Sequence, residues 1–179
     1  LSEDEIYGLF EGFKYIIPQG SPMYGIGNPY QYVSIGNCFV IPSPLDSYLG
    51  IMYTDSQITQ VSSRRGGVGW DISKLRPIGL PVQNAAKTTT GAMEFVKRFS
   101  NTIREVGQFG RRAASLQSIS VHHPQILDFI KIKRDLTQVT GSNITVQLTD
   151  EFMRAVESDG NFELRWPVCK EDANEMKLN

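Results

Sequence analysis

The stretch from Ser62 to Pro81 holds the residues whose types and spacing could do chemistry. It opens with Arg64 and Arg65, passes through a cluster of glycines, and continues as an alternating apolar run toward Arg76. Glycines let backbone amides approach a ligand closely, and arginine guanidinium groups bind phosphate through paired donors. The spacing therefore predicts a site for an anionic ligand such as a nucleotide. A tight turn that enters a strand, with solvated arginines, explains the same spacing equally well.

The order of the surrounding elements excludes two familiar nucleotide-binding loops. A dinucleotide fingerprint has its glycines after a strand and before a helix, whereas these glycines follow an expected helix and lead into an expected strand. A P-loop ends in Gly-Lys-Ser or Gly-Lys-Thr, and the sequence contains neither triplet. A nucleotide site at this stretch therefore belongs to another fold.

The composition is typical of a globular chain that can bury a core: 179 residues, 40% hydrophobic and 21% charged, with a net charge of −1. The length favours one domain or slightly more. The balanced charge, with arginines gathered in two tight loops, disfavours a nucleic-acid partner. Two cysteines, Cys38 and Cys169, are too few for a disulfide framework, so we expect a reducing, cytoplasmic location. We expect no membrane partner, because we find neither a signal peptide nor an apolar run of 18 residues.

Hydrophobic periodicity predicts the elements that must position these loops. Helices and strands alternate through most of the chain, which favours an α/β architecture with mainly parallel strands and ligands at the carboxyl ends of the strands. The first expected helix is a docking helix that follows a Ser2–Glu5 capping box. The second runs from Asp46 or Ser47 to about Arg64, with a break near 54–55. Three more helices are expected to start at about 88–91, 123–124 and 149. The expected strands are a buried strand over 37–41 and strands over 68–75, about 116–121, 144–148 and 162–166. The expected loops cover 18–29, 64–69 and 107–112.

Five stretches, in the same order and with similar spacing, resemble the amino-terminal part of the catalytic (large) subunit of ribonucleotide reductase. They cover residues 37–42, 64–69, 75–79, 108–113 and 123–130. The residues in these stretches are most similar to those of the adenosylcobalamin-dependent (class II) enzymes, with class I left open. The resemblance implies about the first half of a ten-stranded α/β barrel. Its parts would be an N-terminal helix in 1–17, the barrel segment with its substrate and effector loops in 18–168, and a polar tail in 169–179.

The resemblance also implies a reaction and its participants. A thiyl radical removes the 3′-hydrogen of a ribonucleotide, a cysteine pair supplies two electrons, and the 2′-hydroxyl is replaced by hydrogen. The sequence lacks the Asn-x-Cys-x-Glu site that carries the radical cysteine, so the chain alone is expected to be inactive. The chain begins at Leu1, so we expect a piece of something longer or a trimmed chain. The implied partners are a ribonucleotide, a dNTP effector, the rest of the barrel in cis or in trans, and a second copy in a homodimer. Adenosylcobalamin would serve the whole enzyme and bind mostly outside these residues.

Carried over by position, Cys38 matches one member of the reducing cysteine pair. The alternative for Cys38 is a small buried apolar side chain. Ser21, Asn37 and Gly67 match positions that line the substrate, and a turn glycine is the alternative for Gly67. Arg112, with Arg111 as the alternative register, would contact the substrate base or phosphate through its planar guanidinium.

The implied effector site uses a second set of residues. Asp46, Ser47 and Tyr48 match the segment that reads the effector base, although Asp46 could simply cap a helix. Arg76 matches an arginine that binds the effector phosphate, and a solvated turn arginine is its alternative. Gln83 stands where many relatives have a second arginine, which weakens one phosphate contact. Gln108 belongs to the second specificity loop, between effector and substrate base; His122 and His123 look structural, and no metal site is expected.

Two other functions remain open at this point. The first is a non-catalytic deoxynucleotide-binding module, regulatory or for assembly, that keeps the two specificity loops. The second is a structural module in which both glycine-arginine loops are merely turns. Dependence of function on Cys38 would distinguish the enzyme from both.

Overall fold

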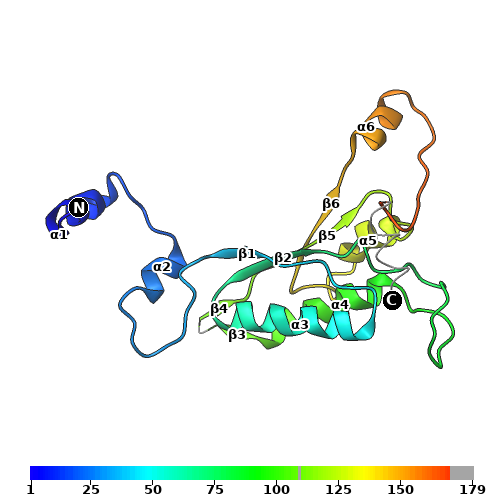
Figure 1. Cartoon of the computed structure of the whole chain (residues 1–179). Coiled ribbons are helices and arrows are strands. Elements are labelled where there is room, and N and C mark those ends of the chain that lie inside the picture. Colours follow the sequence, from blue (N-terminus) through cyan, green and yellow to red (C-terminus); the bar gives the residue numbers. More distant parts are fainter. Residues whose placement is uncertain (109, 170–179) are drawn as a thin grey trace.

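The computed structural model describes residues 1–108 and 110–169, which are built around a parallel sheet. In this part of the chain the strands β1 (Cys38–Val40), β2 (Gly67–Asp71), β5 (Ser115–Ser120) and β6 (Asn143–Gln147) lie in the order β1-β2-β5-β6 (Figure 1). Every neighbouring pair is parallel. The predicted α/β fold with parallel strands is therefore confirmed. Phe109 and, beyond Cys169, the predicted polar tail lie outside the described residues.

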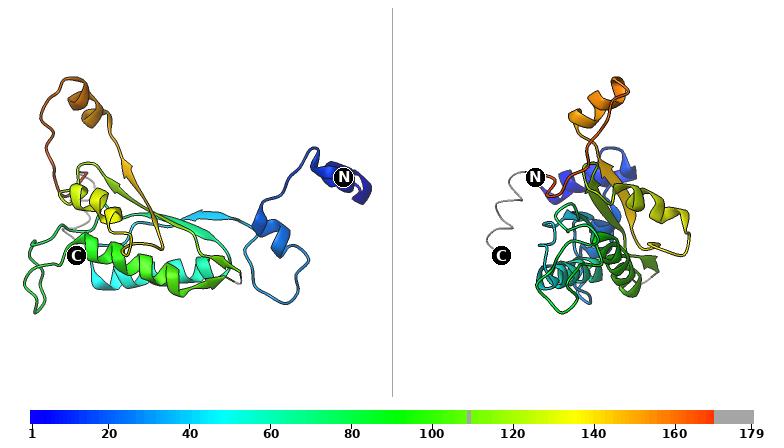
Figure 2. Two further views of the ribbon diagram at one scale, coloured as in Figure 1. Left: turned by 180° about the vertical axis from the view of Figure 1, so that it is seen from behind. Right: turned by 90° about the vertical axis from the view of Figure 1, so that its right-hand side faces the viewer.

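Helices cover one face of this sheet. The helices α3 (Tyr48–Ser63) and α4 (Ala92–Glu105) lie side by side along it in both side-on views (Figures 1 and 2). α4 buries apolar residues three and four positions apart, which is the pattern of a helix with one face in a core. The ring of Phe99 meets the indole of Trp70 from β2 edge-on, with 5.5 Å between centroids. The short α5 (Ile126–Lys131) adds two buried residues to the same core.

The opposite face of the sheet is open. Successive strand residues point to opposite faces, and Val68 is buried toward the helices, so Gly67 and Gly69 point to the other face. The register aligns Cys38 with Gly67 and Leu116 with Gly69. Cys38 is exposed and Leu116 is 42% exposed. The predicted redox cysteine therefore lies on an open sheet face beside a residue that has no side chain.

β1 is an exposed edge strand, and this corrects the buried strand predicted over 37–41. In the described chain β1 pairs with β2 alone, so its other edge carries no partner strand. All three of its residues are exposed, and Val40 reaches 89%. The apolar composition of β1 is typical of a strand that is covered by further structure on its free side.

The N-terminal segment projects away from the sheet (Figure 1). In α1 (Glu3–Phe10) the predicted capping box is confirmed, because Ser2 and Glu5 each accept a hydrogen bond from the other's backbone N–H. A 3-10 turn (Glu11–Phe13) follows. No residue of α1 is buried, so the prediction that this helix docks is wrong for the described chain. The predicted loop over 18–29 contains a short helix, α2 (Gly20–Gly25).

Two element boundaries differ from the sequence pattern for local reasons. β2 ends at Asp71 rather than near residue 75, because the Asp71 carboxylate accepts hydrogen bonds from the backbone N–H and hydroxyl of Ser73 at 3.1 and 2.9 Å and turns the chain. α3 continues through the predicted break. There the Asp55 side chain ties α3 to α4, accepting from the Thr102 hydroxyl at 2.6 Å and from Arg98 at 2.9 Å.

The later part of the chain also departs from three expectations. The predicted loop over 107–112 is a small antiparallel hairpin of β3 (Gly107–Gln108) and β4 (Arg111–Arg112). α5 begins at Ile126, not at His123, and two of its expected inward residues, Leu127 and Ile130, are exposed. The expected strand over 162–166 is absent from the described chain, because no neighbouring strand pairs with it.

The remaining elements follow the pattern. β6 alternates as predicted, a 3-10 turn (Ile132–Arg134) follows α5, and α6 (Asp150–Glu157) is capped by the Thr149 hydroxyl, which accepts from the Phe152 N–H at 3.3 Å. Within the described ranges, the helices are all too short or too polar to cross a membrane.

Candidate functional site

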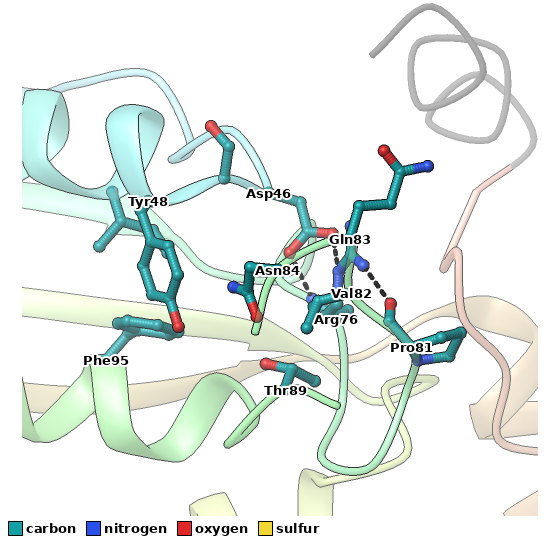
Figure 3. Close-up of a pocket in the computed structure, with 11 residues that line it drawn as sticks. Asp46, Tyr48, Arg76, Pro81, Val82, Gln83, Asn84, Thr89 and Phe95 are labelled. Carbon is teal, nitrogen blue, oxygen red and sulfur yellow. Dashed lines mark hydrogen bonds and ion pairs between the residues drawn. The ribbon is translucent and has the colours of Figure 1, made fainter. Parts of the chain in front are cut away.

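A cavity of about 480 Å³ opens at the carboxyl edge of the sheet, where the chain leaves β1 and β2 (Figure 3). Five of the six residues assigned to effector binding line it, and they come from the start of α3 with the two residues before it, the turn after β2 and the following loop. These five are Asp46, Ser47, Tyr48, Arg76 and Gln83. The cavity also contains residues that the sequence analysis missed: Ile51, Pro81, Val82, Asn84, Thr89 and Phe95.

An ion pair between Asp46 and Arg76 forms one wall of this cavity. The Asp46 carboxylate accepts from the Arg76 backbone N–H at 3.0 Å and from Nε at 2.5 Å. Arg76 Nη1 also donates to the carbonyl of Pro81 at 2.6 Å. The side chains are only 11% and 28% exposed, so water screens the pair little. The alternative of a solvated turn arginine is therefore excluded for Arg76, and Asp46 is not the helix cap.

The first turn of α3 forms a second wall. The hydroxyl of Ser47 accepts from the Gly50 N–H at 3.1 Å and caps the helix, as predicted for Asp46 or Ser47. The next residue, Tyr48, is 58% exposed. Its ring stands edge-on to that of Phe95, with 6.3 Å between centroids, so an aromatic pair borders the cavity.

The third wall is the loop between Arg76 and α4, which folds back on itself. The Thr89 N–H donates to the Leu80 carbonyl at 2.9 Å, and the Val82 N–H donates to the Lys87 carbonyl at 2.9 Å. Gln83 lies at the exposed turn of this loop and extends its amide outward (Figure 3). A sequence signal that could have revealed this loop is the long distance between Arg76 and the helix expected to start at about 88–91.

One buried residue outside the predicted set holds both ends of the loop. Gln125 Oε1 accepts from the backbone N–H groups of Ile78, at 3.1 Å, and Ala92, at 3.0 Å. Between them Gly91 has φ of +89°, and a Cβ there would lie 2.6 Å from Gln125 Oε1, so only glycine fits. Type and spacing gave no signal for Gln125, because its partners are 47 and 33 residues away.

Three of the four residues assigned to substrate binding, Ser21, Asn37 and Gly67, meet at the opposite, amino edge of the sheet. Asn37 Oδ1 accepts from the Ser21 N–H at 2.9 Å, and Asn37 Nδ2 donates to Gln19 Oε1. The Asn37 carbonyl accepts from the Gly67 N–H at 2.7 Å. Asn37 thus joins α2 to the start of β2, directly before Cys38. These three assigned residues therefore lie at the amino edge, and not at the carboxyl ends of the strands, where ligands were expected.

Among the described residues of the second glycine-arginine loop, Gln108 and Arg112 do not line this cavity. The buried Gln108 donates from Nε2 to the Ser62 carbonyl at 2.6 Å, at the C-terminal end of α3. The cavity lies at the other end of this 16-residue helix, roughly 24 Å away. Arg112 is exposed in β4. Within one chain, the structure therefore separates Gln108 and Arg112 from the residues around Arg76.

The two histidines lie in packed positions. His123 Nε2 bonds the Leu75 carbonyl at 2.9 Å and its Nδ1 accepts from the Gln125 N–H at 3.1 Å. Burial lowers the pKa of His123 against the raising effect of the Leu75 carbonyl. His122 stacks on Phe162 with 4.7 Å between ring centroids. Both contacts agree with the structural role predicted for these residues.

Comparison with known proteins decides the family. The family described as "Ribonucleotide reductase, barrel domain" matches residues 36–177. This chain belongs to the ribonucleotide reductase barrel family. The match contains Asn37, Cys38 and every residue of the effector set, whereas Ser21 lies before it.

Relatives of this chain come from bacteria, archaea and eukaryotes. A "Vitamin B12-dependent ribonucleoside-diphosphate reductase" of Mycobacterium tuberculosis is 34% identical over 128 residues, which is 70% of this chain and 18% of that protein. A protein of the same name from Thermoplasma acidophilum is 31% identical over 142 residues, 78% of this chain and 18% of its own length. "Ribonucleoside-diphosphate reductase large chain 2" of Saccharomyces cerevisiae is 26% identical over 160 residues, 86% of this chain. The chain spans about a fifth of the length of the curated relatives it matches.

Proposed function

We propose that this chain works as part of a ribonucleotide reductase, to which it contributes one redox cysteine and a site for a deoxynucleotide effector. The observation that supports this proposal is the gathering of Asp46, Ser47, Tyr48, Arg76 and Gln83 around one cavity. The chain spans 18% of its relatives' length. The rest of the barrel, in the same chain or another, must therefore supply the radical cysteine and the acid-base carboxylate.

Cys38 is the proposed electron donor. In the net reaction two thiols give up two hydrogens, one disulfide forms, the ribose 2′-hydroxyl leaves as water and a deoxyribose remains. Cys38 suits this task because its thiol is exposed on the open face, beside Gly67. Gly67 is itself buried and places no side chain beside the sulfur. The second thiol would come from the rest of the barrel.

The cavity at the carboxyl edge is the proposed effector site. Its volume of about 480 Å³ lies in the usual range for small-ligand pockets. Asp46 fixes the Arg76 guanidinium through Nε, which orients its remaining donors for a phosphate group. Tyr48 and Phe95 offer ring surfaces for a base. These features favour a deoxynucleoside triphosphate over an uncharged ligand.

Adenosylcobalamin is proposed for the complete enzyme because two relatives carry vitamin B12 dependence in their names. When bound, it would supply the radical. Two cavities among the described residues hold about 480 and 460 Å³, and both are too small for a corrin with its nucleotide loop. We therefore assign no residue of this chain to the cofactor.

A homodimer is proposed through the exposed side of α3. Four apolar side chains, on the first turns of this helix, face solvent in the single chain: Tyr48, Leu49, Met52 and Tyr53. Leu49 is 82% exposed. A contiguous apolar surface of this kind marks a protein contact. A second copy would bury it and would bring further residues close to the effector cavity.

A non-catalytic deoxynucleotide-binding module is the second candidate. It is favoured by the fact that this chain builds the cavity from its own residues, while the sequence lacks Asn-x-Cys-x-Glu. The test that separates the candidates is a reductase assay of the complete protein with Cys38→Ser, run beside calorimetric dNTP titrations. The reductase proposal expects loss of deoxynucleotide formation with unchanged dNTP affinity. Full activity of Cys38→Ser would overturn the redox role.

The effector assignment is tested in the same titrations with Arg76→Ala. Loss of a charged hydrogen-bond donor is expected to weaken dNTP binding about tenfold or more. Arg64→Ala is the matched control, because the Arg64 guanidinium bonds Gln60 at the far end of α3. Equal affinities in the two variants would contradict the effector site.

A further inference from the structure

The junction between α2 and the loop before β2 contains an arginine in an unusual backbone conformation. Arg65 has φ of +68°, in the left-handed region that favours glycine. Its neighbours Gly66 and Gly67 are not among the residues with positive φ. They serve close packing instead, since a Cβ on Gly66 would lie 2.6 Å from Val61 Cγ1. The strained position thus carries a long side chain although glycine would suit the backbone better.

The Arg65 side chain stacks on an aromatic ring of α2. Its guanidinium carbon lies 3.9 Å from the centroid of the Tyr24 ring, a close cation–π contact. Within the described chain, Arg65 Nε is buried and makes no hydrogen bond. A guanidinium tolerates this environment because it is weakly hydrated and stacks on aromatic faces. The Tyr24 hydroxyl is oriented in turn by a hydrogen bond to Gln31.

α2 depends on such contacts for its position. It has six residues, too few to be stable alone. Ser21 is its one buried residue, with an exposed fraction of 1%, and the Ser21 hydroxyl has no partner among the described residues. Asn37 ties the start of α2 to β2. The Arg65–Tyr24 stack is a second tie across the same junction, one helical turn further along.

We propose that Arg65 is a positioning residue, which clamps α2 through Tyr24 and so sets the distance between Ser21 and the Gly67–Cys38 pair. This inference rests on the proposed reductase function, because it concerns the floor on which the ribonucleotide would lie. Arg65 acts through Tyr24 and Ser21 and does not itself touch the substrate. The strained backbone at Arg65 is kept because the Arg65 side chain holds the Tyr24 ring, which a glycine at that position cannot do.

The test uses the complete protein with Arg65→Gly, which relaxes the backbone and removes the stack. We expect KM for the ribonucleotide to rise about tenfold, with dNTP affinity unchanged and the unfolding midpoint unchanged or higher. Tyr24→Leu should reproduce the KM change, and Arg65→Lys should restore only part of the affinity, because lysine lacks the planar group. Tyr24→Phe, which keeps the ring, is the matched control and should stay within about twofold of the wild type.

A second measurement keeps this inference separate from the reductase proposal. Hydrogen exchange of residues 20–25 should quicken in Arg65→Gly and in Tyr24→Leu more than exchange in α4 does, whether or not the protein reduces nucleotides. Unchanged exchange in α2 would overturn the clamp. An unchanged KM in Arg65→Gly would also overturn it. A rise in KM together with weaker dNTP binding and lower stability would overturn it too, because that combination marks a general folding role. A wild-type protein without reductase activity would overturn the proposed function alone.

Discussion

At the scale of single residues, Gln83 is the position where the resemblance to ribonucleotide reductase leads us to expect a second arginine. Gln83 lines the effector cavity from an exposed turn. Its amide can donate a hydrogen bond to a phosphate oxygen but has no charge to offset that of a triphosphate. Among the described residues that line the cavity, Arg76 is then the one cation that we propose for a phosphate group.

Gln83→Arg is therefore expected to tighten dNTP binding about twofold to tenfold at low salt, and to lose most of this gain near 1 M salt, where charges are screened within about 3 Å. Calorimetric titration at two salt concentrations measures both effects. Thr140→Arg is the control, because it adds the same charge at an exposed position outside the cavity. An equal gain in both variants would point to net charge rather than to the site.

His123 gives a prediction about pH. Burial lowers its pKa in the folded chain below the ordinary value of 6.5, so the unfolded chain takes up a proton that the folded chain refuses. The stability that neutral His123 contributes is complete above pH 6.5 and falls as the pH drops below it, by at most about 1.4 kcal/mol per pH unit. The stability of His123→Asn should fall less steeply as the pH drops, because asparagine can donate and accept hydrogen bonds without titrating. Urea unfolding between pH 8 and pH 5 measures this, and a difference between the two proteins that stays constant with pH would contradict it.

At the scale of elements, the loop between β2 and α4 depends on one side chain. Gln125→Leu would leave the backbone N–H groups of Ile78 and Ala92 without their acceptor. We expect the free energy of unfolding to fall by about 2 to 4 kcal/mol, since each unpaired buried donor costs about 1 to 3 kcal/mol. Weaker dNTP binding should accompany this loss, because the loop forms a wall of the cavity.

Urea titration compares this variant with Gln138→Leu, which removes a surface hydrogen bond to Asp135. The control should change stability by less than about 0.5 kcal/mol. Similar losses in the two variants would mean that the Gln125 amide does not hold the loop.

The elements also show how far sequence could lead. Caps at Ser2 and Thr149, the alternation of β6 and the helical face of α4 are local signals, and the structure contains them. The exposed edge at β1 and the unpaired run over 162–166 were misread, because a strand needs a neighbour that periodicity cannot show. The five cavity residues were named by resemblance, whereas Gln125 and the strain at Arg65 depend on contacts distant in sequence.

At the scale of the whole molecule, the chain has helices on one face of its sheet and little on the other (Figure 2). The open face carries Cys38, and the edge strand β1 is exposed. The exposed side of α3 is apolar on its first turns, away from the open face. Two different surfaces are therefore uncovered in the described chain. We propose the rest of a barrel for the open face and the β1 edge, and a second copy for the exposed side of α3.

The α3 surface leads to the last prediction. Leu49→Arg should weaken self-association of the chain at least about tenfold, because a charge replaces an apolar side chain at the proposed dimer contact. Leu136→Arg is the matched control, since Leu136 is 85% exposed and Leu49 is 82% exposed, and only Leu49 belongs to α3. Sedimentation equilibrium with and without dNTP measures the dissociation constant. If an effector binds near the interface, dNTP should strengthen the wild-type dimer and leave Leu49→Arg mostly monomeric, because binding and association are linked. Equal association of both variants would show that α3 is not the contact, and the effector site would then have to be complete within one chain.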